Sequence, residues 1–334
     1  MGRKTNYNKI VTDELWQKVN DKNKELLEEW VDYLYSVDRS EQTIKQYIND
    51  LKIFFVYLLN KCKNKFFIEM TKKDISRFQA YMLRELESSS SRIRRMKSAI
   101  SSMSNYIENM LDEEEEFKDF RNIVNKIEHP VVVRVREHTI LEKEDVENIL
   151  NHLTEQGEYQ KACVFALAAF SGSRIGELIQ FKESYFKDEY IDNGLYQTPE
   201  KIRGKGFGKV GKPKIAFTLA ENFKPYFDKW LKKRKELGVD IDDLFVYKKD
   251  NKWLPYSIHG LNGWKKGFSK ILGVNFYFHC LRHFYVTSLV KAGYPIDFIK
   301  TIVGWSSADM VDIYTDIGVE EKIKNYLEGK EVKI

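Results

Sequence analysis

The segment "HPVVVRVREHT", residues 129–139, constrains the fold most strongly, because helical periodicity is interrupted there. Pro130 and the four valines cannot continue a helix and predict an extended linker that ends near residue 138. The 334 residues on its two sides are enough for two globular domains, each with its own core. The predicted layout is a polar extension 1–22, a helical domain 23–112, a linker 113–138 and a second domain 139–334.

Four helical patterns fill the predicted first domain. They begin near residue 23, at Ser40, at Thr71 and near residue 90, and the last runs to about residue 111. Ser40 and Thr71 are residues that cap helix N-termini, and Asp74 follows Thr71 by three positions. The acidic run 112–116 is interpreted as a solvated helix end. These patterns predict a small all-helical domain.

The predicted second domain is mainly helical with a small β-sheet. The stretch "YQKACVFALAAFSG" is too uniformly apolar for a surface helix and predicts a buried one that ends at a tight turn at Gly172. Glycines and alternating residues over 185–218 predict strands and hairpins. Further helices are predicted at 220–237, 257–271, 280–292, 295–303, 307–315 and 319–329.

Bulk composition excludes some classes of protein. The formal net charge of +5 is only mildly basic, so the positions of the charges matter more than their sum. The three cysteines, Cys62, Cys163 and Cys280, are far apart and predict neither a zinc site nor a disulfide framework, which fits a cytoplasmic protein. We expect no membrane partner, because no apolar run reaches 18 residues.

Two arginines lie in patterns suited to binding a phosphate. Arg174, in "SGSRIGEL", follows the apolar helix and begins the next one, where backbone N–H groups also favour anions. Arg282, in "HCLRHF", lies one helical turn from His279 and beside His283. Histidine can donate a hydrogen bond to a phosphate or transfer a proton. Taken singly, each residue also fits a structural role.

Three further residue types complete a possible phosphodiester chemistry. Lys205 lies in the glycine-rich "RGKGFGKVGK", and a lysine there can protonate a leaving oxygen; Lys209 and Lys212 are alternatives in the same loop. Tyr314, in "DIYTDI", can act as a nucleophile where cations stabilise its phenolate. Trp305, in "VGWSS", can donate its indole N–H to a phosphate.

The order and spacing of these motifs resemble the tyrosine recombinase (phage integrase) family over nearly the whole chain. "SGSRIGEL" is similar to that family's first-arginine motif, "HCLRHF" to its histidine–arginine box, and "VGWSS" with "DIYTDI" to its last two motifs. The sequence departs from the family at Ser173 and Gly176. Trp305 stands where many members have histidine, and tryptophan also occurs there.

The resemblance implies a fold and a set of roles. The fold would be a four-helix SAM-like core-binding domain followed by an α+β catalytic domain. Arg174 and Arg282 would bind the scissile phosphate, Lys205 would be the general acid, and His279 and Trp305 would hydrogen-bond the phosphate with support from His283. Tyr314 would form a 3′-phosphotyrosyl intermediate. The family uses no metal or nucleotide cofactor.

The resemblance also implies a partner, double-stranded DNA, and a cellular context. The protein would act in site-specific recombination and DNA integration by a mobile element, in the cytoplasm at the nucleoid. We expect a homo-tetramer on DNA and a monomer or weak oligomer when free. The apolar stripe of the tail helix, including Val319 and Leu327, would pack on a neighbouring protomer or, equally, within its own chain.

Cations gather at the start of the predicted helix 90–111, where they oppose the helix dipole and would be explained by bound phosphates. The candidate DNA-binding residues, with two lysines of the second predicted helix, are Arg92, Arg94, Arg95, Lys97, Lys45 and Lys52.

Two other functions remain open from the sequence. The first is a recombinase-fold DNA-binding regulator, such as a phage repressor, that has lost recombination activity. The second is an enzyme like the type IB topoisomerases, which share the chemistry.

Overall fold

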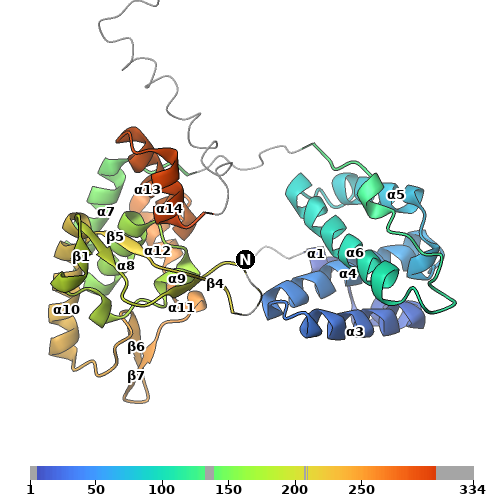
Figure 1. Cartoon of the computed structure of the whole chain (residues 1–334), viewed down its shortest axis with the longest axis horizontal. Helices are drawn as coiled ribbons and strands as arrows, with labels where there is room; N and C mark the ends of the chain where they lie inside the picture. Colours follow the sequence, from blue (N-terminus) through green and yellow to red (C-terminus); the bar gives the residue numbers. More distant parts are fainter. Residues whose placement is uncertain (1–5, 132–138, 207, 209, 306–334) are drawn as a thin grey trace, which may run out of the picture. The chain divides into compact units, whose positions relative to one another are not determined.

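The chain divides into two compact units, Met1–Glu137 and His138–Ile334, in a computed structural model that describes residues 6–131, 139–206, 208 and 210–305 (Figure 1). The predicted helices at 307–315 and 319–329, and with them Tyr314, lie outside the described residues. Among the described residues, each unit is mostly helical, and the short strands all belong to the second.

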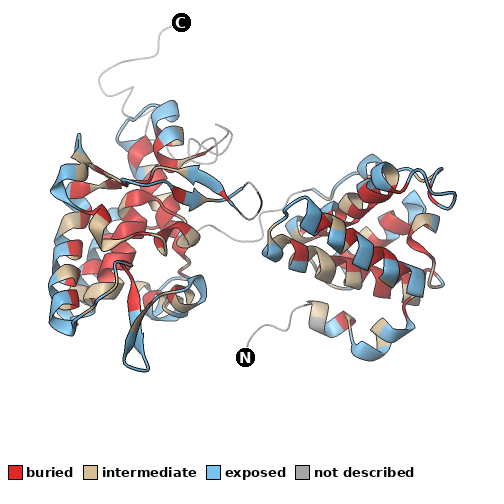
Figure 2. Ribbon diagram, turned by 60° about the horizontal axis from the view of Figure 1, so that its bottom comes forward, coloured by how far each residue is buried: buried red, intermediate tan, exposed pale blue. Residues whose placement is uncertain are grey.

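Four long helices form most of the first unit, as the sequence predicted. They are α3 (Asp21–Ser36), α4 (Glu41–Lys61), α5 (Lys72–Arg84) and α6 (Ser90–Met110). The side chains of Ser40, Thr71 and Ser89 each accept a hydrogen bond from a backbone N–H in the first turn of α4, α5 and α6 respectively. Figure 2 shows buried residues on the inward faces of these helices.

The first unit extends beyond these helices at both ends. Residues 6–18 contain α1 (Asn6–Ile10) and α2 (Asp13–Lys18), and Ile10 and Val19 join the buried core. The predicted linker also contributes, since Phe117 and Val124 are buried in the same core beside the 3₁₀ turn η2 (Val124–Lys126). A further 3₁₀ turn, η1 (Phe67–Glu69), precedes α5. Widely spaced apolar residues in polar segments give no periodic signal, which is why the sequence did not predict this packing.

Helix α8 (Tyr159–Ser171) is the buried centre of the second unit, as its apolar sequence predicted. Residues Ala162–Ala169 are all at most 1% exposed. Around it pack α7 (Lys143–Glu155), α10 (Ala220–Leu237) and α13 (Phe278–Lys291). The helix ends at Gly172, which has φ +59° in the left-handed region.

Short antiparallel strands complete the second unit. A three-stranded sheet has the order β1 (Ile191–Asp192), β2 (Leu195–Gln197), β5 (Phe217–Leu219), and a two-stranded ribbon pairs β3 (Ile202–Gly204) with β4 (Lys212–Lys214). The turns η3 (Glu183–Tyr185) and η4 (Asp188–Tyr190) precede them. The hairpin of β6 (Val246–Lys249) and β7 (Lys252–Pro255) was not predicted from the sequence.

The remaining helices are short. They are α9 (Ile175–Leu178), α11 (Ile258–Gly263), α12 (Lys265–Leu272) and α14 (Ile296–Val303). The single helix predicted at 257–271 is interrupted at Trp264, next to Gly263, a residue of low helix propensity. Within the described ranges, no helix has both the length and the apolar character needed to cross a bilayer.

Candidate active site

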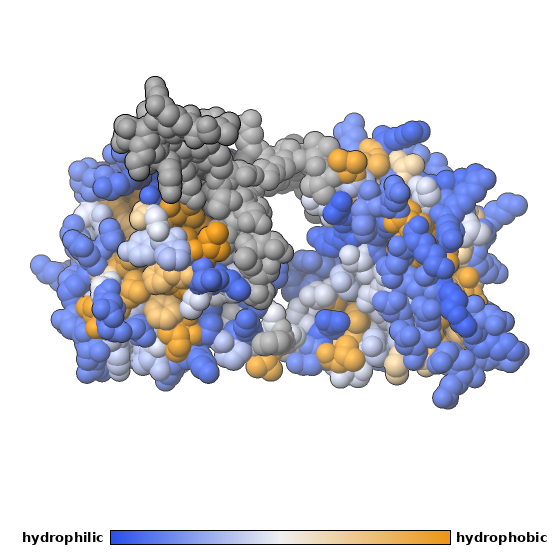
Figure 3. All heavy atoms as spheres, turned by 45° about the horizontal axis from the view of Figure 1, so that its top comes forward, coloured by the Kyte–Doolittle hydropathy of each residue, from blue (hydrophilic) through white to orange (hydrophobic). Residues whose placement is uncertain are grey.

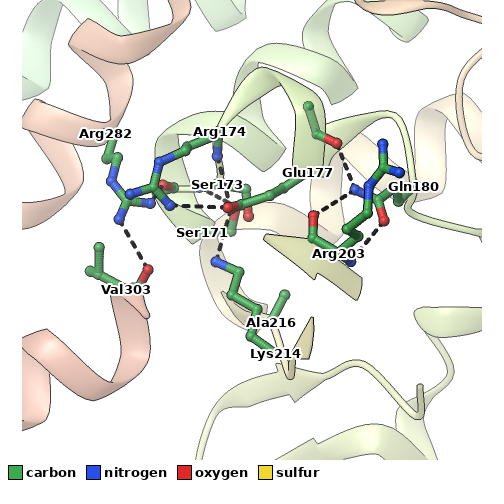
Figure 4. Close-up of polar contacts among 12 residues, drawn as sticks. Ser171, Ser173, Arg174, Glu177, Gln180, Arg203, Lys214, Ala216, Arg282 and Val303 are labelled. Carbon is green, nitrogen blue, oxygen red and sulfur yellow. Dashed lines mark hydrogen bonds and ion pairs between the residues drawn. The ribbon is translucent and has the colours of Figure 1, made fainter. Parts of the chain in front are cut away.

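Arg174 is placed by the sharp turn between α8 and α9. Gly172 ends α8, and Arg174 precedes the first residue of α9. Its backbone N–H donates to Oε2 of Glu177 at 3.0 Å, and its Nη1 donates to Oε1 of the same carboxylate at 3.1 Å (Figure 4). The Arg174 side chain remains 28% exposed, so solvent or a ligand can reach it.

Arg282 is buried on α13 and joins three segments of the chain. Its Nη1 donates to the carbonyl oxygen of Gly172 at 2.7 Å, and its Nη2 donates to that of Val303 at 3.0 Å. Gly172 and Arg282 are 110 residues apart in the sequence, yet this bond brings Arg282 to the turn that carries Arg174. Both acceptors are neutral carbonyl groups, so these bonds fix the guanidinium without cancelling its charge.

Glu177 and Lys214 form an ion pair inside the site, and the sequence did not reveal either role. The Nζ of Lys214, at the end of β4, is 2.8 Å from Oε2 of Glu177, whose side chain is only 2% exposed. Burial alone would raise the pKa of Glu177, but Lys214 and Arg174 outweigh it and hold that pKa below its ordinary value. Burial lowers the pKa of Lys214, and the charges of Arg282 and Arg174 add to the shift, whereas Glu177 opposes it.

A sequence signal for Lys214 exists in the strand pattern. Ala216 and Thr218 are buried two and four positions later, so period-two alternation puts Lys214 on the inward side of the chain. For Glu177 the signal is its position three residues after Arg174, within reach of the backbone N–H at the helix start.

Trp305 lies against Arg282. The guanidinium carbon of Arg282 is 5.3 Å from the centroid of the Trp305 ring, which is within the range of a cation–π contact. Trp305 is 7% exposed and follows Gly304, which ends α14 in the left-handed region at φ +73°. The backbone N–H of Trp305 donates to the carbonyl of Lys300 at 2.9 Å, which closes this turn.

The two histidines lie on consecutive turns near the start of α13. Their ring centroids are 4.8 Å apart with the ring planes nearly perpendicular. His279 is exposed and His283 is half-buried.

Lys205 is exposed directly after β3, at the beginning of the β3–β4 hairpin loop. Lys212 is exposed on β4, and Lys209 lies outside the described residues. Gly211, at φ +73°, is required there, because a Cβ atom would lie 2.1 Å from Cγ of Arg203. Lys205 is thus exposed at the loop, whereas the Lys214 side chain is only 13% exposed.

The cations predicted to bind DNA in the first unit have different surroundings. Arg92 and Arg95 both bind the buried carboxylate of Asp50, Arg95 through Nε at 3.0 Å. Burial raises the pKa of Asp50 to about 6, although Arg95 opposes the shift. Arg94 is exposed and donates to the carbonyl of Pro130 at 3.2 Å.

The three lysines also differ. Lys45 is exposed, and Lys52 lies over the Trp16 ring, with Nζ 4.6 Å from its centroid. Lys97 is buried and donates to the carbonyls of Ile127 and Glu128 at 2.7 and 3.2 Å. Its ammonium group therefore holds the segment after η2 in place. Most of the visible surface of the first unit is hydrophilic in Figure 3.

Protein-family models match both parts of the chain. Residues 139–321 match the phage integrase family, and residues 26–114 match the phage integrase N-terminal SAM-like domain. One curated relative is the SPbeta prophage-derived recombinase-like protein YomM of Bacillus subtilis, 28% identical over 71% of this chain and 68% of that protein. Another is a tyrosine recombinase of Thermosipho africanus, 24% identical over 89% of this chain and 96% of that protein.

Solved structures share the fold. One is XerH site-specific recombinase bound to palindromic difH substrate, with a TM-score of 0.67, 16% identity, and coverage of 94% of this chain and 98% of that one. Another is a lambda integrase dimer bound to a COC′ core site, with a TM-score of 0.60, 15% identity, and coverage of 93% and 99%. Because the phage integrase model spans more than half of its residues, the chain belongs to the phage integrase family of tyrosine recombinases.

Proposed function

We propose that this chain is a catalytically active tyrosine recombinase that acts at specific DNA sites. It cuts and rejoins duplex DNA through a 3′-phosphotyrosyl intermediate. The observation that carries the proposal is the hydrogen bond from Arg282 to the Gly172 carbonyl, which joins the two arginine motifs at one turn. A phosphate there would meet guanidinium groups from two distant segments of the chain.

The charge of the cluster favours an anionic ligand. Within the described part of the chain, Arg174, Arg282 and Lys214 bring three positive charges to this cluster, and Glu177 brings one negative charge. Fixed cations that face the charge developing on a phosphoryl group stabilise its transition state most when they are already in position. The carbonyl bonds of Arg282 supply such preorganisation.

Each step of the reaction has a residue to perform it. Arg174 and Arg282 bind the non-bridging oxygens of the scissile phosphate, with hydrogen bonds from His279 and Trp305, and His283 supports them. The Tyr314 oxygen bonds to phosphorus and releases its proton to solvent, while the bond from phosphorus to the 5′ oxygen breaks. Lys205 gives that oxygen a proton. A 5′-hydroxyl of the exchanged strand then reverses these steps, so the phosphodiester energy is conserved.

The first unit would contribute phosphate contacts to the same DNA. The exposed Arg94, Arg95 and Lys45, with the partly exposed Arg92 and Lys52, are its candidates, and neutralising phosphates gives salt-dependent affinity. Relatives of the same fold have been solved on their DNA substrates, which supports a DNA partner. We propose a homo-tetramer on DNA, as strand exchange between two duplexes requires four cleavages.

The direct test is a suicide substrate. The purified protein selects its binding site from a random duplex library, and that site is then nicked near the crossover so that the cleaved 5′-hydroxyl fragment diffuses away. We expect a covalent protein–DNA adduct, with mass spectrometry locating the DNA on Tyr314. Tyr314→Phe should abolish the adduct, whereas Tyr294→Phe, a change at an exposed tyrosine of the same unit, should preserve it.

Other outcomes identify other functions. Tight, sequence-specific binding with no adduct would make the protein a regulator that has kept the fold but lost the reaction. Relaxation of a supercoiled plasmid without strand exchange would indicate an enzyme of the topoisomerase type.

A further inference from the structure

Lys214 is a charged residue of the cluster to which the reaction steps described above assign no task of its own. Its side chain is 13% exposed, and its Nζ is 2.8 Å from Oε2 of Glu177. Burying the ammonium group of a lysine to this extent has a large desolvation cost. A lysine with a structural role at the surface would avoid that cost. Its burial beside the two arginines therefore indicates a role in the site.

The carboxylate of Glu177 is shared between two cations. Oε2 accepts from both Lys214 and the backbone N–H of Arg174, and Oε1 accepts from the Arg174 guanidinium (Figure 4). Without Lys214, the full negative charge of Glu177 would act on Arg174 and draw its guanidinium away from a phosphate. With Lys214 present, Glu177 still orients Arg174, and the Lys214–Glu177 ion pair leaves the positive charge of Arg174 available to a phosphate.

Lys214 also borders the segment that fixes Arg282. A Cβ atom added at Gly304 would lie 3.0 Å from Cδ of Lys214 and 3.5 Å from its Nζ, so the lysine stem runs directly beside this turn. Gly304 follows Val303, whose carbonyl accepts from Arg282. One side chain thus adjoins the supports of both arginines.

We propose that Lys214 is a positioning residue, which balances the charge of Glu177 and so holds the Arg174 guanidinium in the geometry that binds the scissile phosphate. The proposal rests on the proposed recombinase function. It assigns Lys214 a task separate from that of Lys205, which reaches the leaving oxygen from the exposed hairpin.

The competing role for Lys214 is proton donation. Burial lowers its pKa, with Arg282 and Arg174 adding to the shift against Glu177, and a lowered pKa makes a lysine a better acid. The two roles differ in their dependence on the leaving group. A 5′ oxygen needs a proton as it departs, whereas a 5′ sulfur departs as a thiolate, since thiols have pKa values near 8.5.

The experiment measures single-turnover cleavage of the suicide duplex with either oxygen or sulfur at the bridging 5′ position. Lys214→Met, which keeps the stem without the charge, should slow cleavage about 100-fold on both substrates, the size of effect expected from a misplaced catalytic group. Lys214→Arg should recover most of the rate. Lys205→Ala is the control for proton donation. The substrate with sulfur at the bridging 5′ position should restore the cleavage rate of this variant.

A second variant tests the charge balance itself. Glu177→Gln combined with Lys214→Met removes both charges of the buried pair, and such paired replacements often preserve folding. If Lys214 acts by balancing Glu177, the double variant should cleave at least 10-fold faster than Lys214→Met alone. A purely structural lysine would give no such recovery.

Three results would overturn the assignment. Rescue of Lys214→Met by sulfur would make Lys214 the general acid, a wild-type rate in that variant would leave it without a role, and a double variant no faster than the single one would exclude charge balance. Failure of the proposed function is distinct from all three, because the unmodified protein would then form no Tyr314 adduct with either substrate.

Discussion

Glu177 is held in the interior of the second unit by cations on two sides, Arg174 and Lys214. A buried carboxylate in this setting stabilises the fold only while it is ionised, because its partners would otherwise be buried without a counter-charge. The same three residues set the electrostatic field of the candidate site. Stability and function are therefore coupled at the level of single side chains.

This coupling predicts a pH-dependent effect of Glu177→Gln. The pKa of Glu177 is lower in the folded protein than its ordinary value, so its ionisation stabilises the fold above about pH 4.3, its unfolded pKa. That stabilisation is lost as the pH falls through the folded pKa. We expect the free energy of unfolding of the variant to be about 3 kcal/mol lower than that of the unmodified protein at pH 7. This difference should shrink below pH 4. Urea denaturation of both proteins at a series of pH values measures this difference. A difference that does not change with pH would contradict a stabilising role for the ionised Glu177.

Sequence motifs predicted Arg174 and Arg282 because a guanidinium at a helix start and an arginine between two histidines are visible as local patterns. They could not reveal Lys214 as the partner of Glu177, because this pair depends on the register of β3 and β4 and on the depth of the carboxylate. Likewise, the burial of Lys97 depends on the path taken by residues 127–128, which pack back on α6.

At the scale of elements, the turn from α8 to α9 is the feature that organises the site. Gly172 occupies it with φ +59°, and its carbonyl accepts from Arg282. The ring of Tyr285 on α13 packs against its Cα, so that an added Cβ would lie 2.6 Å from Cδ1 of the ring. Two physical constraints, the backbone conformation and the close contact, therefore require glycine here.

Gly172→Ala should separate these constraints when compared with Gly157→Ala. Gly157 has a similar φ of +70° but no atom within 4 Å of an added Cβ. Gly157→Ala should lower the free energy of unfolding by about 1 kcal/mol, through backbone strain alone. Gly172→Ala should lower it by a further 1–3 kcal/mol, because the added Cβ overpacks the contact with Tyr285. Thermal or urea unfolding of the two variants provides the comparison. Equal losses would mean that the contact with Tyr285 relaxes freely.

Helix α6 carries neighbouring cations with different surroundings, exposed at Arg94 and buried at Lys97. Arg94→Ala should lower the slope of log affinity against log salt for DNA binding by about one, the effect of one lost phosphate contact. Lys97→Ala should leave that slope unchanged but destabilise the first unit by about 1–3 kcal/mol, because two carbonyl groups lose their donor. Salt titrations of DNA binding and denaturation of both variants test this, and the reverse pattern would contradict the structural role of Lys97.

At the scale of the whole molecule, the chain consists of two units with separate cores on either side of residue 137. The division into two units, the four long helices and the buried α8 were predictable because each leaves a strong periodic or compositional signal. The added packing of residues 6–19 and 117–124 was not, because it is built from isolated apolar residues in polar segments. The roles assigned to the candidate site residues, among them Arg174, Arg282, Lys205 and Tyr314, and to the cations of the first unit remain predictions.

The central claim is that Arg174 and Arg282 act on one phosphate. The most direct measurement is a structure of the chain bound to duplex DNA that carries its selected site. We expect both guanidinium groups to donate hydrogen bonds, of about 2.8–3.0 Å, to non-bridging oxygens of the same scissile phosphate. A structure in which the two arginines contact different phosphates, or in which either turns away from the DNA, would contradict it.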